Sequence, residues 1–157
     1  MPDRLAHHRQ RPLPDDERIA WLRLIRSANV GPSTFFSLLE RFGTAQRALD
    51  ALPDLARRGG RAGTIRIATA AAASRELEEA PRIGATLLAW GEPTYPPLLA
   101  HIHDPPPVIY ARGRQDLLTK KTIGVVGARN ASTNGRRFAK KLAADLGGGG
   151  LMVVSGL

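Results

Sequence analysis

Residues 125–133 read VVGARNAST, and this stretch decides how the second half of the chain is expected to fold. The apolar residues of KTIGVVGA show no polar alternation, which is typical of a strand in a buried parallel sheet. A helix over STNGRRFAKKLAADLG and a second buried strand over LMVVSG follow it. Strand, turn, helix and strand within such a short span predict a βαβ unit with a right-handed crossover.

The turn of this unit has the features of an anion site. Ligands of an open parallel sheet bind beyond the carboxyl ends of its strands, and the GARNAS turn lies there. Gly127 allows the backbone to bend, and Ser132 can cap the helix while other N–H groups of its first turn stay free. Arg129 offers a planar charge that matches phosphate oxygens. Ser155 and Gly156 end the next strand, so we expect them to face the turn.

The spacing also excludes two common phosphate motifs. G-x-G-x-x-G is absent, and no G-K-[ST] of a P-loop occurs. The residues of this turn could also have purely structural roles. Arg129 could form a surface salt bridge, Ser132 could be a cap and nothing more, and Ser155 with Gly156 could form a simple turn.

The charge distribution favours an anionic polymer as the partner. The chain carries 23 Lys plus Arg against 14 Asp plus Glu, a net charge of +9. The window 120–141 holds seven basic residues and no acidic one: Lys120, Lys121, Arg129, Arg136, Arg137, Lys140 and Lys141. On the helix we expect Phe138, Leu142 and Leu146 to be buried and the four cations to lie opposite them. A merely solvated basic face is the alternative.

The first half of the chain reads as a small helical module. We expect a disordered basic tail over 1–14, helices over 15–80, the last of them at about 66–80, and a sheet domain over 81–157. The sequence NVGP at 29–32 predicts a hairpin between two helices, with Gly31 in the tight turn and Pro32 opening the second helix. This unit is similar to a degenerate helix-hairpin-helix, which either packs in the core or contacts nucleic acid or a partner. ATLLAW and VIYARG predict strands.

Composition excludes several classes of site. The chain has no cysteine, so disulfides, thiolate metal sites and cysteine nucleophiles are excluded. It contains no apolar run long enough to span a membrane, and its basic start lacks the apolar segment of a secretion signal. We therefore expect a cytoplasmic protein that makes no use of a membrane, and we assign no cofactor and no metal.

Several stretches together resemble the DNA-processing protein A (DprA/Smf) family. They are YPPLLAHIHDPPPVIYARG, IGVVGARNAST with GRRFAKKLAADL, and VVSGL. WLRLIRSANVGPSTFFSLLERFGTAQRAL resembles the sterile-alpha-motif-like N-terminal region of that family. The resemblance implies an α/β fold, with a SAM-like helical domain followed by an incomplete Rossmann-like parallel sheet.

The resemblance also implies a function. Family members bind single-stranded DNA and load the RecA recombinase onto it in natural transformation (competence), without catalysis. Arg129 would contact DNA phosphate, with Gly127, Ser132, Ser155 and Gly156 shaping the pocket and Arg136, Arg137 and Lys140 beside it. The complete family protein is expected to be a homodimer. The family sequence continues beyond the point where this chain stops, so we expect a fragment or an early-terminated product that aggregates readily and binds DNA weakly.

Two other functions remain as alternatives. A nucleotide-binding Rossmann-like hydrolase of the phosphoribosyl-cleaving type would need an acid or base near the turn, yet Asp145 is the sole carboxylate within 120–157. His101, His103 and Asp104 leave a loop metal site open, although two histidines in a loop are a weak signal. The helical region could instead be a protein-interaction module.

Overall fold

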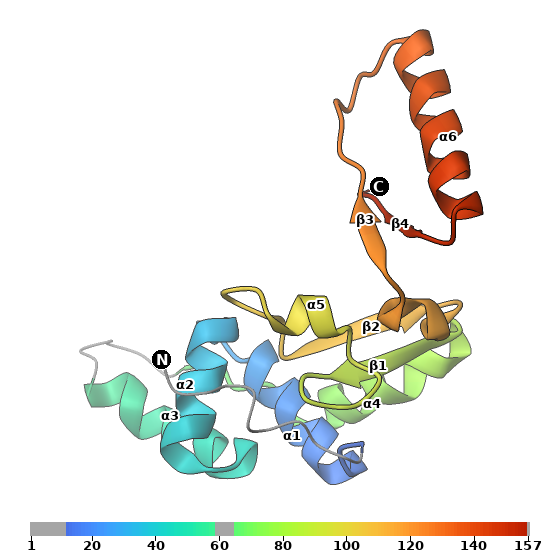
Figure 1. Cartoon of the computed structure of the whole chain (residues 1–157). Coiled ribbons are helices and arrows are strands. Elements are labelled where there is room, and N and C mark those ends of the chain that lie inside the picture. The colour runs from blue at the N-terminus through green and yellow to red at the C-terminus, as the bar shows by residue number, and fades with distance from the viewer. Residues whose placement is uncertain (1–11, 59–64, 157) are drawn as a thin grey trace. The chain divides into compact units, whose positions relative to one another are not determined.

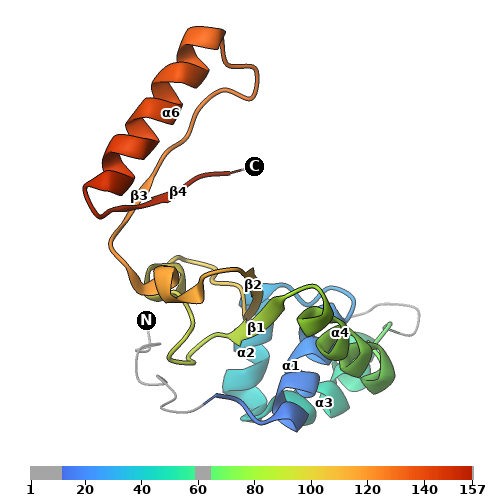
Figure 2. The same cartoon turned by 90° about the vertical axis from the view of Figure 1, so that its right-hand side faces the viewer.

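The computed structural model describes residues 12–58 and 65–156. The chain divides into two compact units between Gln115 and Asp116, and each unit is described here by itself (Figures 1 and 2). Most of the expected basic tail, residues 1–11, lies outside the described residues. The expected domain boundary after residue 80 differs from this division and stays a prediction.

The first unit is built on four helices: α1 (Asp15–Arg26), α2 (Pro32–Phe42), α3 (Ala45–Arg58) and α4 (Ala70–Arg82). Their apolar faces meet in one core, in which the Trp21 and Phe35 rings contact edge to face at 4.9 Å. Burial of such aromatic and aliphatic surface is the main force that holds the helices together. On α1, Leu22 is fully buried and Ile19 and Ile25 are partly buried.

The hairpin between α1 and α2 differs in detail from the expectation. Pro32 opens α2 as predicted, but the residue with left-handed backbone is Asn29, whose φ is 63°. Gly31 has a φ of −92°, which any residue can adopt. The amide of Ala28 donates to the carbonyl of Arg66 at 2.9 Å, so the chain before α4 packs directly on the hairpin.

The last helix of the unit begins later than predicted. α4 starts at Ala70, whereas we expected a start near residue 66. The Thr69 side chain caps it by accepting the Ala72 amide at 3.1 Å. Residues 66–69 instead form no regular secondary structure, because their backbone groups bond to α1 and to the hairpin: Arg23 donates its Nε to the carbonyl of Ala68 at 3.1 Å.

A two-stranded antiparallel sheet completes the first unit. β1 (Ala85–Ala89) pairs with β2 (Val108–Arg112), and Leu87 lies opposite Tyr110. Both strands match the predicted positions, and β1 packs against α4 and the helical core (Figure 1). The loop between them carries the short helix α5 (Pro97–Ala100), and the Tyr95 hydroxyl donates to the carbonyl of Pro106 at 2.7 Å. This bond joins the two sides of the proline-rich loop across α5.

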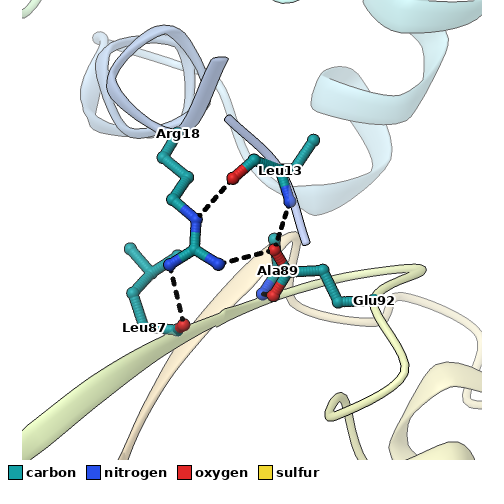
Figure 3. A network of polar contacts seen from close by, with 5 residues as sticks. All are labelled: Leu13, Arg18, Leu87, Ala89 and Glu92. Atoms are coloured by element: carbon teal, nitrogen blue, oxygen red, sulfur yellow. Dashed lines mark hydrogen bonds and ion pairs between the residues drawn. The ribbon is translucent and has the colours of Figure 1, made fainter. Parts of the chain in front are cut away.

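A buried polar network joins α1 to the turn after β1 (Figure 3). The Glu92 carboxylate accepts from the Leu13 amide at 2.7 Å, from Arg18 at 2.8 Å and from the Ala89 amide at 3.0 Å. Arg18 also donates to the carbonyls of Leu13 and Leu87. The helices and the sheet of the first unit are therefore linked by polar contacts as well as by the apolar core.

The second unit contains the expected strand–helix–strand arrangement. Its elements are the short 3₁₀ helix η2 (Gln115–Thr119), β3 (Thr122–Gly124), α6 (Thr133–Gly148) and β4 (Met152–Val154). β3 and β4 run parallel, with Thr122 opposite Met152. Each strand is shorter than predicted, although the Val125 amide still donates to the carbonyl of Val154 at 2.8 Å. The fold class is thus α/β: a helical N-terminal domain and two short sheets, the parallel one consistent with an incomplete Rossmann-like sheet.

The predicted buried stripe of α6 is only partly present. Phe138 is 69% exposed, and Leu142 and Leu146 are half-buried. These side chains stay partly or largely exposed because α6 is longer than the strand beneath it. A 16-residue helix is about 24 Å long, whereas the three-residue strand β4 that it packs against spans about 10 Å. The expectation that Phe138 is buried was therefore wrong for this chain.

Candidate nucleic-acid interface

The start of α6 forms as the sequence predicts. Ser132 has extended backbone, and its hydroxyl accepts the amide of Gly135 at 3.2 Å. Its carbonyl accepts the Arg136 amide at 2.9 Å, which closes the first turn of the helix. The cap satisfies one of the amides that a helix leaves unpaired at its start. The remaining first-turn amides, with the positive end of the helix dipole, make this end attractive to an anion.

Two residues of the preceding turn are open to solvent. Arg129 is exposed, and among the described residues its side chain makes no hydrogen bond or ion pair. A Cβ placed on Gly127 would meet no described atom within 4 Å. At Gly135, the nearest atom to a Cβ would be the Ser132 hydroxyl oxygen at 3.4 Å. Gly135 therefore borders its own helix cap, not the sheet.

Ser155 and Gly156 lie at the same end of the sheet as this turn. β3 and β4 are parallel and in register, with Gly124 opposite Val154. The chain leaves both strands at this end, so the structure brings the two predicted loops out of the same sheet edge. The Ser155 hydroxyl donates to the carbonyl of Gly156 at 3.3 Å, and both residues are exposed.

The cations of α6 share one side of the helix. At 100° per residue, Arg136, Lys140, Arg137 and Lys141 fall within an arc of about 140°, and Phe138, Leu142 and Leu146 fall outside it. All four cations are exposed, and in the described part of the chain none forms an ion pair. Lys120 and Lys121 do not join them, because they precede β3 and so lie at the opposite end of that strand.

Positive charge is concentrated in the second unit. Residues 116–156 hold seven basic and two acidic side chains, whereas the described residues up to 115 hold twelve basic and eleven acidic ones. The helical unit is therefore almost neutral over its described residues. An anionic polymer would be attracted mainly to the unit that carries the Arg129 turn and α6.

The loop histidines do not form a metal centre. His103 contacts Asp104 at 3.2 Å through its Nδ1, and the Nδ1 of His101 contacts the carbonyl of Pro97 at 2.6 Å. Over residues 12–58 and 65–156 no group of three His, Asp or Glu side chains is arranged to hold a metal ion.

The first unit also holds a polar cluster that sequence reasoning did not find. Arg26 donates to both oxygens of Glu76, at 2.8 and 3.1 Å, and the Tyr110 hydroxyl donates to Glu76 at 3.0 Å. Burial alone would raise the pKa of Glu76, but the hydrogen bond and charge of Arg26 and the bond from Tyr110 outweigh it and lower that pKa. These residues come from α1, α4 and β2, so no local pattern connects them.

Comparison with known families places these features in context. Residues 15–79 match the model of the DprA-like N-terminal HHH domain, and residues 86–157 match the model of DNA recombination-mediator protein A. The chain belongs to the DNA-processing protein A (DprA/Smf) family. This family has a DNA-processing role in recombination, and the two matches correspond to the helical region and to the part that holds the GARNAS turn.

Two curated relatives agree with this assignment. DNA processing protein DprA of Bacillus subtilis (strain 168) is 35% identical over 100 residues, which cover 56% of this chain and 34% of the relative. Protein Smf of Synechocystis sp. is 36% identical over 85 residues, which cover 52% of this chain and 21% of the relative. The chain thus spans about a third or less of the length of these relatives. Within the described ranges, no helix is both long and apolar enough to cross a membrane.

Proposed function

We propose that this chain carries part of a single-stranded DNA-binding site of a recombination mediator. The site consists of Gly127, Arg129 and Ser132 in the turn, Ser155 and Gly156 beside it, and Arg136, Arg137 and Lys140 on α6. Its role is to hold the phosphate backbone without chemical change to the DNA. In the complete protein, this binding would serve to load RecA onto incoming DNA during natural transformation in the cytoplasm, with a homodimer as the active form.

One observation carries the proposal: exposed cations that have no carboxylate partner among the described residues lie beside a helix start that retains free amides. Arg129 and the α6 cations are exposed and, among the described residues, unpaired with carboxylates. A solvated helix ordinarily mixes charges to gain pairs between neighbouring turns. A row of cations beside free amides instead suits repeated phosphates, and single-stranded DNA binding is expected to depend on such backbone contacts.

The experiment is a salt titration of binding to fluorescent single-stranded and duplex oligonucleotides. We expect sequence-tolerant binding whose log affinity falls with log salt by about 0.7 per neutralised phosphate. Arg129→Ala should weaken binding by about 1–3 kcal/mol, because it removes a charge-assisted contact. Arg47→Ala is the matched control, since Arg47 is an exposed arginine of the nearly neutral helical unit.

Two results would contradict the proposal. The first is binding that does not respond to salt, and the second is an equal effect of Arg129→Ala and Arg47→Ala. Turnover of a nucleotide by this chain, lost in Arg129→Ala, would favour the hydrolase alternative instead. The RecA-loading step itself is measured with a full-length protein of the family.

A further inference from the structure

Two neighbouring cavities lie along α4 in the first unit. One, of about 560 Å³, is lined by Ala72, Arg75, Glu76, Glu79, Ala80, Ile83, Ala85 and Tyr110. The other, of about 510 Å³, is lined by Arg26, Arg66, Ile67, Ala68, Thr69, Ala72, Ala73 and Glu76. Ala72 and Glu76 border both, so the two cavities form one trough, which we call the α4 trough.

The wall of the α4 trough is mostly apolar and small. Alanines from α4, from β1 and from the segment before α4 contribute much of it, and Ile83 at one end is 63% exposed. Small side chains leave room for a large one from a partner. An exposed aliphatic residue beside such a hollow is a common feature of sites that accept an apolar anchor.

The charges of the α4 trough are not balanced. The Arg26 guanidinium and the Glu76 carboxylate neutralise each other through their ion pair at 2.8 Å. Arg66 and Arg75 are exposed, and within the described residues neither side chain has a hydrogen-bond or ion-pair partner. Glu79 faces the Ile83 end, so the excess positive charge falls at the Arg66 end. The start of α4 at Thr69 adds the positive end of a helix dipole there.

We propose that the α4 trough binds an extended acidic segment of a protein partner. A large apolar side chain of that segment enters the cavity beside Ile83 and Tyr110, and a carboxylate near it in the sequence pairs with Arg66. The apolar wall and the hollow suit a large apolar peptide side chain, and the sugar-phosphate backbone of DNA has no such group to place there. The trough is thus a docking site of the helical unit, and it shares no residue with the proposed DNA site.

The test measures fluorescence anisotropy of the labelled peptide Gly-Gly-Asp-Asp-Gly-Phe-Gly-Gly with the whole chain, and of versions that vary the spacing between the aspartates and the phenylalanine. We expect at least one to bind, and its binding to weaken about tenfold when lysines replace the aspartates or alanine replaces the phenylalanine. Tenfold in affinity corresponds to about 1.4 kcal/mol, within the range of one charge-assisted contact.

Matched variants locate the site. Arg66→Glu and Ala72→Leu should each weaken binding about tenfold, the first by repulsion and the second by filling the hollow that both cavities share. Arg82→Glu and Ala71→Leu are the controls, because both are exposed α4 residues that border neither cavity. Circular dichroism of each variant checks that the helices are retained.

Three outcomes would overturn the proposal. They are the absence of binding by every peptide of the set, equal binding of the aspartate and lysine peptides, and equal effects of Arg66→Glu and Arg82→Glu. A single-stranded oligonucleotide is added as a competitor. If the oligonucleotide displaces the peptide, and Arg66→Glu weakens oligonucleotide binding as much as peptide binding, the trough binds nucleic acid and the peptide proposal is rejected.

Discussion

Arg18 and Glu92 lie 74 residues apart in the sequence and meet in an ion pair of 2.8 Å. The Glu92 side chain is 1% exposed and that of Arg18 is 17% exposed. A buried carboxylate is tolerated when donors occupy its oxygens, and here Arg18 and the amides of Leu13 and Ala89 do so (Figure 3). The pair therefore ties the start of α1 to the turn that follows β1.

Removal of the Glu92 carboxylate should destabilise the first unit strongly. Glu92→Ala leaves Arg18 and two amides without their acceptor, which should lower the free energy of unfolding by about 3–5 kcal/mol. Both tryptophans of the chain, Trp21 and Trp90, lie in this unit, so their fluorescence during urea denaturation reports on it. Glu78→Ala, at an exposed position of α4, should change stability by no more than about 0.5 kcal/mol. Equal shifts in the two variants would refute a structural role for Glu92.

The Glu76 pair should contribute stability that depends on pH. Its pKa is lowered from the ordinary 4.5, because the charge and hydrogen bonds of Arg26 and Tyr110 outweigh the opposing effect of burial. A lowered pKa in the folded state means that the stabilisation is present above pH 4.5 and is lost as pH falls below it. Glu76→Gln should cost no more than about 1 kcal/mol at pH 7, since the pair is partly exposed.

Comparison at two pH values isolates this effect. Denaturation of wild type and Glu76→Gln should differ at pH 7 and converge in acid, where the wild-type carboxylate also becomes protonated. Glu79→Gln is the control, at an exposed position of the same helix. A difference that persists undiminished in acid would mean that shape, not charge, accounts for the role of Glu76.

Local signals explain what the sequence alone could predict. The acidic first turn of α1, Pro32 at the start of α2 and the Ser132 cap of α6 depend on residues a few positions apart. Gly43 ends α2 with a φ of 80°, a left-handed backbone conformation that glycine adopts without strain, so this signal is also local. The predicted starts of α1, α2 and α6 therefore agree with the structure.

Long-range contacts explain what the sequence could not predict. The delayed start of α4 follows from bonds between residues 66–69 and α1, and the burial of Glu92 follows from a partner in another element. The exposure of Phe138 depends on how much strand lies beneath α6, which no helical periodicity reveals. The roles of Arg129 and its neighbours at the candidate site stay predictions, because charge and exposure permit phosphate binding without identifying the ligand.

The two tyrosines of the chain should resist ionisation while the protein is folded. Burial raises the pKa of Tyr95 to about 12, and burial with the nearby Glu76 carboxylate raises that of Tyr110 above its ordinary range. Raised values favour the protonated form, so this stabilisation is complete below pH 10 and is lost as pH rises toward the folded values. Absorbance at 295 nm should stay flat through pH 10 and rise only near pH 12 or on unfolding. A normal titration midpoint near pH 10 would show that both hydroxyls are solvated.

A methyl group at residue 127 should separate DNA binding from folding. A Cβ there would meet no described atom within 4 Å, so Gly127→Ala should leave the unfolding transition unchanged. If a phosphate occupies that space, the same methyl group pushes it away from Arg129 and weakens DNA binding by about 1 kcal/mol. Anisotropy with a single-stranded oligonucleotide measures the binding, and circular dichroism follows the fold.

Ser132 supplies the matched comparison for this substitution. Ser132→Ala removes the bond to the Gly135 amide and should destabilise α6 by about 1 kcal/mol, whereas Ser132→Gly should cost a few tenths. Loss of helical signal is thus expected for Ser132→Ala and not for Gly127→Ala. If Gly127→Ala leaves DNA affinity intact while Arg129→Ala reduces that affinity, the phosphate does not approach the backbone of the turn. The Arg129 side chain then binds the phosphate at a greater distance from the backbone.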